Sequence, residues 1–248
     1  MSADGRWVVF DSDASNLVSG DTNEATDCFI RSLVSGKTTR VSISSSGAQG
    51  NDFSLCYSVS STGRFVAFGS RAANLVAGDT NADSKGNHGW DIFVHDRDKD
   101  ADGIFDEAGA VATTRENVSS SGTQANNSYF DMSRPAVMSA SGRYVAFSSM
   151  ATNLVTGDTN GGEIGQDVFV RDRQLRKTVR VSLSSGNAQG NGNSWSPAIS
   201  ANGRFVTFIS VASNLVSGDT NNDADILVRD RDKDVDGIYD EAGAVATI

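Results

Sequence analysis

Residues 203–230, GRFVTFISVASNLVSGDTNNDADILVRD, decide the fold because they are one of four copies of the same pattern. The other copies span 5–31, 63–96 and 142–172. In each copy, Gly-Arg leads an alternating apolar run that ends in Phe. Asn-Leu-Val and Gly-Asp-Thr-Asn follow, and an Asp then opens a second apolar run. A fixed unit that recurs every few tens of residues indicates a solenoid, a propeller or an array.

The apolar residues in these runs have the spacing of strands. Segments such as Trp7-Val8-Val9-Phe10 and Phe65-Val66-Ala67-Phe68 are rich in Val and aromatic residues and lack the three- and four-residue spacing of helices. Each unit is interpreted as four strands, as at 193–200, 203–210 and 225–231, with an outer strand like 37–44. Four-stranded antiparallel units arranged radially make an all-β β-propeller. One propeller domain is predicted over 1–248, with units at about 1–46, 47–121, 122–186 and 187–248, and the first unit lacks its inner strand.

The repeat also resembles a known family. Residues 197–210, PAISANGRFVTFIS, and 225–232, DILVRDRD, are similar to the TolB-type, WD-repeat-like propeller repeat. The Asn-Leu-Val-x-Gly-Asp-Thr-Asn insert resembles that of a bacterial, usually secreted, subset of this family. One local departure is Tyr57, which stands where copies three and four have Pro135 and Pro197. The resemblance implies a propeller fold and a periplasmic or secreted interaction module.

Charge and composition narrow the class of partner. A net charge of −10 would repel a phosphate backbone, so no nucleic-acid partner is expected. No apolar run approaches the roughly 18 residues of a membrane span. No signal peptide is present, but the chain starts inside a repeat and is interpreted as a fragment of a longer, extracellular or periplasmic protein.

An open propeller ring would leave sheet edges with unpaired main-chain groups, so the ring is expected to close. Three forms of closure are possible. The four units could close as a small ring, two chains could pair into an eight-bladed ring by self-association through open edges, or the chain could be an arc of a longer propeller. Of these three forms, the repeat pattern favours an arc of a longer propeller.

The two cysteines, Cys28 and Cys56, fall in a third strand and in the inner strand of the next unit. We expect two buried free thiols that act as small apolar side chains. A disulfide would have to join different strand positions in adjacent blades within a narrow Cα window.

Two acidic turns predict calcium sites. Residues 98–106 and 232–240 both read D-x-D-x-D-G-x-x-D. Calcium requires six to eight hard oxygen ligands, and alternate residues of a tight loop aim three carboxylates at one point. The turns resemble the calcium hairpin loops of integrin-type propellers, and they are not EF-hands because position twelve is Gly109 or Gly243. The predicted Ca²⁺ ligands are the side chains of Asp98, Asp100, Asp102, Asp232, Asp234 and Asp236, the carbonyl oxygens of Ile104 and Ile238, and Asp106 and Asp240, directly or through water.

Two further polar segments recur. The Gly-Asp-Thr-Asn loops are interpreted as Asx-turns, with a second metal site as the alternative. The Gln-Asn segments are interpreted as polar connecting loops, with hydrogen bonding to a sugar or peptide as the alternative. They contain Gln49 and Asn51, Gln124 and Asn126, and Gln189 and Asn191.

The two histidines, His88 and His95, do not lie near a Ser or Cys nucleophile motif in the sequence, and no zinc-ligand spacing is present. The predicted function is therefore a calcium-binding, secreted propeller that serves as a binding or scaffold module for protein or carbohydrate, with no cofactor other than Ca²⁺. The alternative is the propeller portion of a secreted hydrolase or lyase that acts on polysaccharide or peptide. Fold analogy alone does not separate the two.

Overall fold

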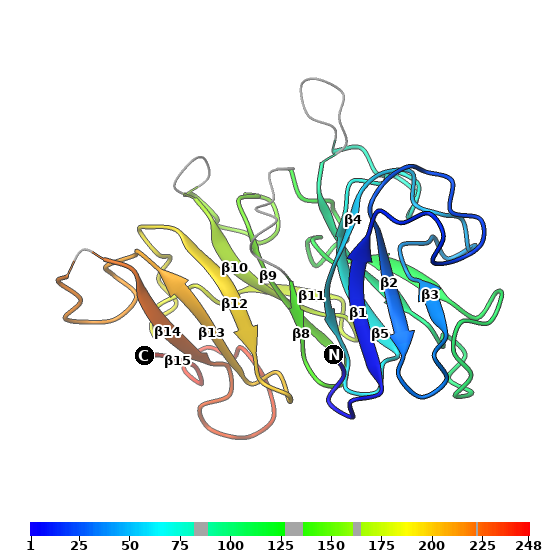
Figure 1. The fold of residues 1–248 in the computed structure, drawn as a ribbon. Coiled ribbons are helices and arrows are strands. Elements are labelled where there is room, and N and C mark those ends of the chain that lie inside the picture. Colours follow the sequence, from blue (N-terminus) through cyan, green and yellow to red (C-terminus); the bar gives the residue numbers. More distant parts are fainter. Residues whose placement is uncertain (82–88, 127–135, 161–164, 222) are drawn as a thin grey trace. The chain divides into compact units, whose positions relative to one another are not determined.

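The protein is described by a computed structural model that covers residues 1–248 except 82–88, 127–135, 161–164 and 222. His88 and Pro135 lie outside the described residues. The described residues form strands and no helix, as the sequence predicts (Figure 1). In chain order the strands are β1 (Trp7–Ser12), β2 (Asp27–Ser32), β3 (Thr38–Arg40), β4 (Ser54–Val59), β5 (Phe65–Ser70), β6 (Asp91–Asp96), β7 (Ala112–Arg115), β8 (Val137–Met138), β9 (Tyr144–Ser149), β10 (Asp167–Asp172), β11 (Lys177–Arg180), β12 (Ser194–Ile199), β13 (Phe205–Ser210), β14 (Asp225–Asp230) and β15 (Ala246–Thr247).

The strands form four antiparallel sheets of the β-propeller blade type. The first blade has the order β1-β2-β3, and the second has β4-β5-β6-β7. The third runs β8-β9-β10-β11 and the fourth runs β12-β13-β14-β15, from the inner to the outer strand. The first blade has three strands and lacks the inner one, as the repeat pattern predicts. Outer strands are shorter than expected: β3 covers Thr38–Arg40 within the predicted 37–44.

Two compact units each contain two blades. One unit comprises Met1–Glu116 with Ala140–Gly142, and the other comprises Asn117–Ser139 with Arg143–Ile248. Within each unit the apolar runs stack sheet against sheet. The first unit's core packs Cys28 and Ile30 of the first blade against Phe68 of the second. The second unit's core packs Val168 of the third blade against Phe208 of the fourth.

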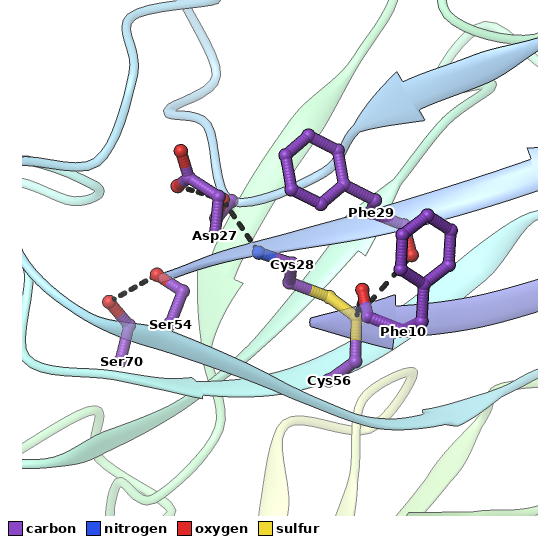
Figure 2. The surroundings of a disulfide bond; sticks show 8 residues. Phe10, Asp27, Cys28, Phe29, Ser54, Cys56 and Ser70 are labelled. Atoms are coloured by element: carbon purple, nitrogen blue, oxygen red, sulfur yellow. Dashed lines mark hydrogen bonds between the residues drawn. A yellow bond between two sulfur atoms is a disulfide. The ribbon is translucent and has the colours of Figure 1, made fainter. Parts of the chain in front are cut away.

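A disulfide joins Cys28 of β2 to Cys56 of β4, so the expectation of two free thiols is wrong (Figure 2). The Cα atoms are 5.1 Å apart, inside the window that a disulfide requires. Both strands contribute to the core between the first two blades, where stacked sheet faces bring the side chains into contact. The repeat pattern places each cysteine on a strand, but the distance between the two strands depends on how the blades stack.

His95 is buried in the second blade at a position that is Arg in the other three blades. Its Nδ1 lies 2.9 Å from Oγ1 of Thr113, whose hydroxyl donates to the carbonyl oxygen of Ile43. The threonine oxygen therefore accepts a hydrogen bond from Nδ1–H, which assigns the neutral ring the tautomer with its proton on Nδ1. Burial lowers the pKa of His95 to about 4, with Arg97 adding to this effect and Asp106 opposing it.

We expect reduction of the disulfide, or the Cys28→Ser/Cys56→Ser double variant, to lower the free energy of unfolding by about 3 to 4 kcal/mol. The bond closes a loop between residues 28 positions apart, and its loss restores chain entropy to the unfolded state. Urea unfolding with and without dithiothreitol measures the change. The double variant should show no further loss with the reductant, and a wild-type midpoint unchanged by reduction would contradict the prediction.

The buried histidine predicts a stability that falls as the solution is acidified. The folded pKa of about 4 lies below the ordinary histidine pKa of 6.5, so protons bind preferentially to the unfolded chain between those values. By pH 4.5 the loss relative to pH 7.5 should be on the order of 2 kcal/mol from this group. Unfolding curves at both pH values, compared with His95→Asn, isolate the effect from carboxylates. An equal pH dependence in the variant would refute it.

Candidate metal centre

The two acidic turns lie at equivalent places in the second and fourth blades. Each connects the third strand to the outer strand, β6 to β7 and β14 to β15. In the first turn, Asp98, Asp100 and Asp102 each offer a carboxylate oxygen, and these oxygens all lie within 4.8 Å of one another. Asp98 is buried and the other two are exposed. The second turn has the same geometry and burial at Asp232, Asp234 and Asp236.

The turns are shaped by their own aspartates and by residues in left-handed backbone conformations. The carboxylate of Asp98 accepts the N–H groups of Asp102 and Gly103, at 3.1 and 3.3 Å. The carboxylate of Asp102 accepts the N–H of Ile104 at 2.8 Å. Gly103 has φ of 90°, and Val235 of the second turn has φ of 64°, which a β-branched residue rarely adopts. The motif therefore specifies one backbone shape in both places.

The remaining predicted ligands separate into two groups. Asp106 turns its carboxylate to Arg97, which donates from Nε and Nη2 at 2.7 and 2.6 Å. Asp240 and Arg231 form the same pair, with a shortest contact of 2.6 Å. The structure therefore does not bring these two carboxylates into the three-aspartate cluster. The carbonyl oxygens of Ile104 and Ile238 accept no hydrogen bond among the described residues.

Besides its aspartate partner, each of these arginines contacts a glycine carbonyl oxygen and two aromatic rings. Arg97 is 1% exposed, donates from Nη1 to the carbonyl oxygen of Gly63 at 2.8 Å, and lies 4.2 Å from the ring centre of Trp7 and 4.8 Å from that of Phe105. Gly63 is required, because a Cβ there would lie 2.2 Å from the Trp7 ring. The base of the first turn is thereby clamped to both blades of its unit.

The second turn is clamped in the same way. Arg231 donates to the carbonyl oxygen of Gly203 and lies between the rings of Tyr144 and Tyr239, at 4.9 and 5.0 Å. A Cβ on Gly203 would lie 2.2 Å from Tyr144. The clamp is therefore a feature of the repeat, with Tyr in place of Trp and Phe.

The donor set at each cluster suits a hard divalent cation. Three carboxylates converge, and neither histidine nor cysteine belongs to the cluster. Such a set favours Ca²⁺ over Zn²⁺, which prefers nitrogen and sulfur ligands. Like charges this close repel one another unless a cation is present. The chemistry of the residues therefore fits the calcium site that the sequence predicts.

The Gly-Asp-Thr-Asn loops are used differently from the acidic turns. In the third blade, Asp158 and Asp167 both pair with Arg180 of the outer strand, at 3.2 and 3.1 Å. Burial raises the pKa of Asp167, against hydrogen bonds from Ser182 and Arg180. Equivalent pairs in the first and second blades join Asp21 and Asp27 to Arg40, and Asp79 and Asp91 to Arg115.

Asx-turn bonding also occurs in these loops, as the sequence predicts. In the first blade, the N–H of Ala25 donates to Oδ1 of Asn23. The arginine partners were not predicted from the sequence. A signal was available, because the outer-strand arginines sit at fixed places in Thr-Thr-Arg and Thr-Val-Arg.

The Gln-Asn segments hold loops together. The N–H of Asn51 donates to Oδ1 of Asn74, whose side-chain amide donates to the carbonyl oxygen of Gln49. The same exchange joins Asn126, Asn153 and Gln124, and also Asn191, Asn214 and Gln189. These side chains therefore serve as polar connectors, which is the role the sequence favours.

A cavity of about 170 Å³ lies beside the second acidic turn. Its lining includes Arg143, Tyr144, Asp172, Tyr239 and Asp240. Both carboxylates are engaged by arginine: Asp172 by Arg143 at 2.7 Å and Asp240 by the clamp described above. Burial raises the pKa of Asp172, but hydrogen bonds outweigh it and hold the pKa below its usual value. The lining therefore lacks a carboxyl group poised for acid–base chemistry.

We expect Arg97→Ala to lower the free energy of unfolding by about 3 to 5 kcal/mol, because it leaves the largely buried Asp106 without its partner. Arg97→Ala/Asp106→Ala should recover part of the loss, since it removes the unpaired charge. Urea unfolding measures both, with Arg31→Ala as an exposed arginine control. A loss no greater than that of the control would contradict the clamp.

Comparison with known proteins finds solved structures that are similar to this chain at low sequence identity. No family model matches the chain, and no curated protein matches it. Among solved structures, TolB from Acinetobacter baumannii is 14% identical with a TM-score of 0.44, over 99% of this chain and 43% of that one. Tricorn protease is 14% identical with a TM-score of 0.48, over 92% and 19%. A putative TolB from Agrobacterium tumefaciens is 15% identical with a TM-score of 0.35, over 99% and 77%. The chain thus spans less than half the length of the first two of these proteins.

Proposed function

We propose that the protein is a calcium-binding β-propeller module that serves as a scaffold or binding surface outside the cytoplasm. The observation that carries this proposal is the convergence of three carboxylates in each of two equivalent turns. Two copies with the same burial and the same backbone conformations argue for a common purpose. An acidic turn needed only for solubility would not require a valine at positive φ.

Calcium would complete a loop that the arginine clamp already holds at its base. The side chains of Asp98, Asp100 and Asp102 supply three ligands, and the carbonyl oxygen of Ile104 supplies a fourth. Asp106, whose carboxylate is paired with Arg97, would reach the ion only through water. The second turn uses Asp232, Asp234, Asp236, Ile238 and Asp240 in the same way. The role is structural, because the ion joins the acidic half of each hairpin to the half fixed against the blade.

Two kinds of chemistry support a compartment outside the cytoplasm. A disulfide persists where the surroundings are oxidising, as in the periplasm or outside the cell. Calcium sites of this open, exposed kind have dissociation constants of about 10⁻⁴ to 10⁻³ M in extracellular modules. Within the described part of the chain, no helix has the length and apolar character that a membrane crossing needs.

The binding role is favoured over catalysis by the cavity beside the second turn. Its carboxylates are held by arginine, and the rings of Tyr144 and Tyr239 form part of its lining. Aromatic rings with polar groups suit recognition of a protein side chain or a sugar ring. The volume of about 170 Å³ is smaller than the 300 to 1,000 Å³ typical of drug-sized ligand pockets.

We expect calcium to raise the melting temperature. At a calcium concentration 100 times the dissociation constant, each site adds about 2.7 kcal/mol, or roughly 5 to 11 °C for a chain of this length. Asp100→Ala should remove the part of the calcium-dependent rise in melting temperature that one site contributes. Asp100→Ala/Asp234→Ala should remove the whole rise. Differential scanning calorimetry in EDTA and in excess calcium measures the shift.

Asp11→Ala is the matched control, because Asp11 is exposed and lies outside both turns. It should leave the calcium response intact. Calcium titration by isothermal calorimetry should give two sites per chain in the wild type and none in the double variant. Identical melting curves in EDTA and in calcium would refute the proposal.

A further inference from the structure

The cavity beside the second acidic turn lies between two connections of unequal length. The short connection from β10 to β11 supplies Asp172, Leu175 and Lys177 to its lining. The acidic turn of the fourth blade supplies residues 237–240. All of the lining residues belong to the second compact unit, so the cavity is formed within one packed body.

Both sides of the cavity are held in place by protein contacts. The carboxylate of Asp172 accepts the N–H groups of Gln174 and Leu175, both at 3.0 Å, and it also pairs with Arg143. These bonds fix the connection that carries Leu175. On the other side, the Arg231 clamp described above fixes the end of the acidic turn. A cavity with fixed sides costs a ligand little ordering of the protein on binding.

The lining carries one positive charge that the protein does not neutralise. It contains three cationic side chains and two carboxylates, and each carboxylate is already paired with an arginine. The remaining cation, Lys177, is exposed, and its ammonium group forms no ion pair or side-chain hydrogen bond among the described residues. The chain as a whole has a net charge of −10. The cavity is therefore a local positive site that favours an anionic group.

The rest of the lining offers an apolar surface for a small group. Leu175, Val179 and Ile238 all line the cavity, and Leu175 and Ile238 are 65% and 55% exposed. Covering such side chains removes apolar surface from water, which is favourable. The volume of about 170 Å³ is close to that of an apolar cavity of roughly 150 Å³ that holds a benzene molecule. The space therefore suits one aromatic or branched aliphatic side chain.

These properties favour a peptide ligand over a sugar. A sugar ring carries several hydroxyl groups, and each of them loses free energy when it is buried without a hydrogen-bond partner. The two carboxylates of the lining, which could accept from hydroxyls, are already engaged by arginine. The cavity instead matches one anionic group close to one apolar group. The last residue of a polypeptide has this combination, because its free carboxylate and its side chain share one Cα atom.

We propose that this cavity binds the carboxyl-terminal residue of a partner polypeptide whose last side chain is apolar. The terminal carboxylate pairs with the ammonium group of Lys177, and the last side chain lies among Leu175, Val179 and Ile238. This inference rests on the binding role proposed above, for which it names the class of ligand. It does not rest on calcium, because the contacts that hold both sides of the cavity are made by the protein itself.

The test titrates the peptide acetyl-Gly-Gly-Leu, with a free carboxyl terminus, into the ¹⁵N-labelled chain in EDTA. Saturable shifts of the Leu175, Lys177 and Ile238 amide signals are expected. The same peptide with a terminal amide should bind about tenfold more weakly, because it loses a charge-assisted hydrogen bond. Acetyl-Gly-Gly-Gly with a free carboxyl terminus should also bind about tenfold more weakly, because it buries no apolar side chain.

A variant assigns the charge contact to one residue. Lys177→Met should weaken binding of the free acid by about tenfold and should bind the acid and the amide equally well. Lys233→Met is the matched control, because Lys233 is exposed in the same acidic turn and does not line the cavity. It removes the same charge and should leave binding unchanged. Equal binding of the free acid by Lys177→Met and the wild type would overturn the proposal.

The wild-type titrations can also overturn it. Absence of saturable shifts, or equal binding of the acid and the amide, would contradict a carboxyl-terminal ligand. Saturable shifts with methyl galactoside in place of the peptide would assign the cavity to a sugar. A calcium-dependent rise in melting temperature without peptide binding would retain the calcium site and overturn this inference. Peptide binding in EDTA without a calcium response would support this inference and overturn the calcium site.

Discussion

Arginine side chains that bridge loops to strands are the interaction on which the rest of the structure depends. Each blade must hold long polar loops on a thin sheet, and a sheet edge alone offers few contacts. Arg40 and Arg180 neutralise two aspartates apiece inside their blades. Arg97 and Arg231 tie each acidic turn to a glycine carbonyl of its own blade and to an aromatic ring of the neighbouring blade, Trp7 or Tyr144. The planar guanidinium suits this work, because it presents several donors and a stacking face at once.

The clamp also explains why the acidic turns can hold their shape. Asp106 and Asp240 are bound by arginine, so the base of each turn is fixed before any cation arrives. The three other aspartates of each turn then converge on one point from a short, tightly wound backbone. A calcium ion would meet a preformed set of oxygens, which lowers the entropy lost on binding. The same repeat thus combines a rigid anchor and a proposed metal site in a single hairpin.

Much of the fold and part of the site follow from local pattern. The period-two runs correctly predict the second and third strands of the blades, and the two acidic turns lie between β6 and β7 and between β14 and β15. The three-aspartate clusters follow from the D-x-D-x-D-G spacing, because ligands two residues apart need only a tight turn to meet. The role of Asp106 did not follow, since its partner is chosen by the packing of Arg97 against Trp7 and Gly63.

The amino-acid sequence by itself determined that this protein is all-β, that it is a four-fold repeat whose first blade lacks a strand, and where its acidic turns lie. These properties depend on neighbours within a few residues or on a recurring spacing. Only the tertiary structure decided that Cys28 and Cys56 are bonded and that the Gly-Asp-Thr-Asn aspartates pair with outer-strand arginines. Each of these depends on the distance between residues on different strands or blades, which sheet stacking sets and sequence spacing does not.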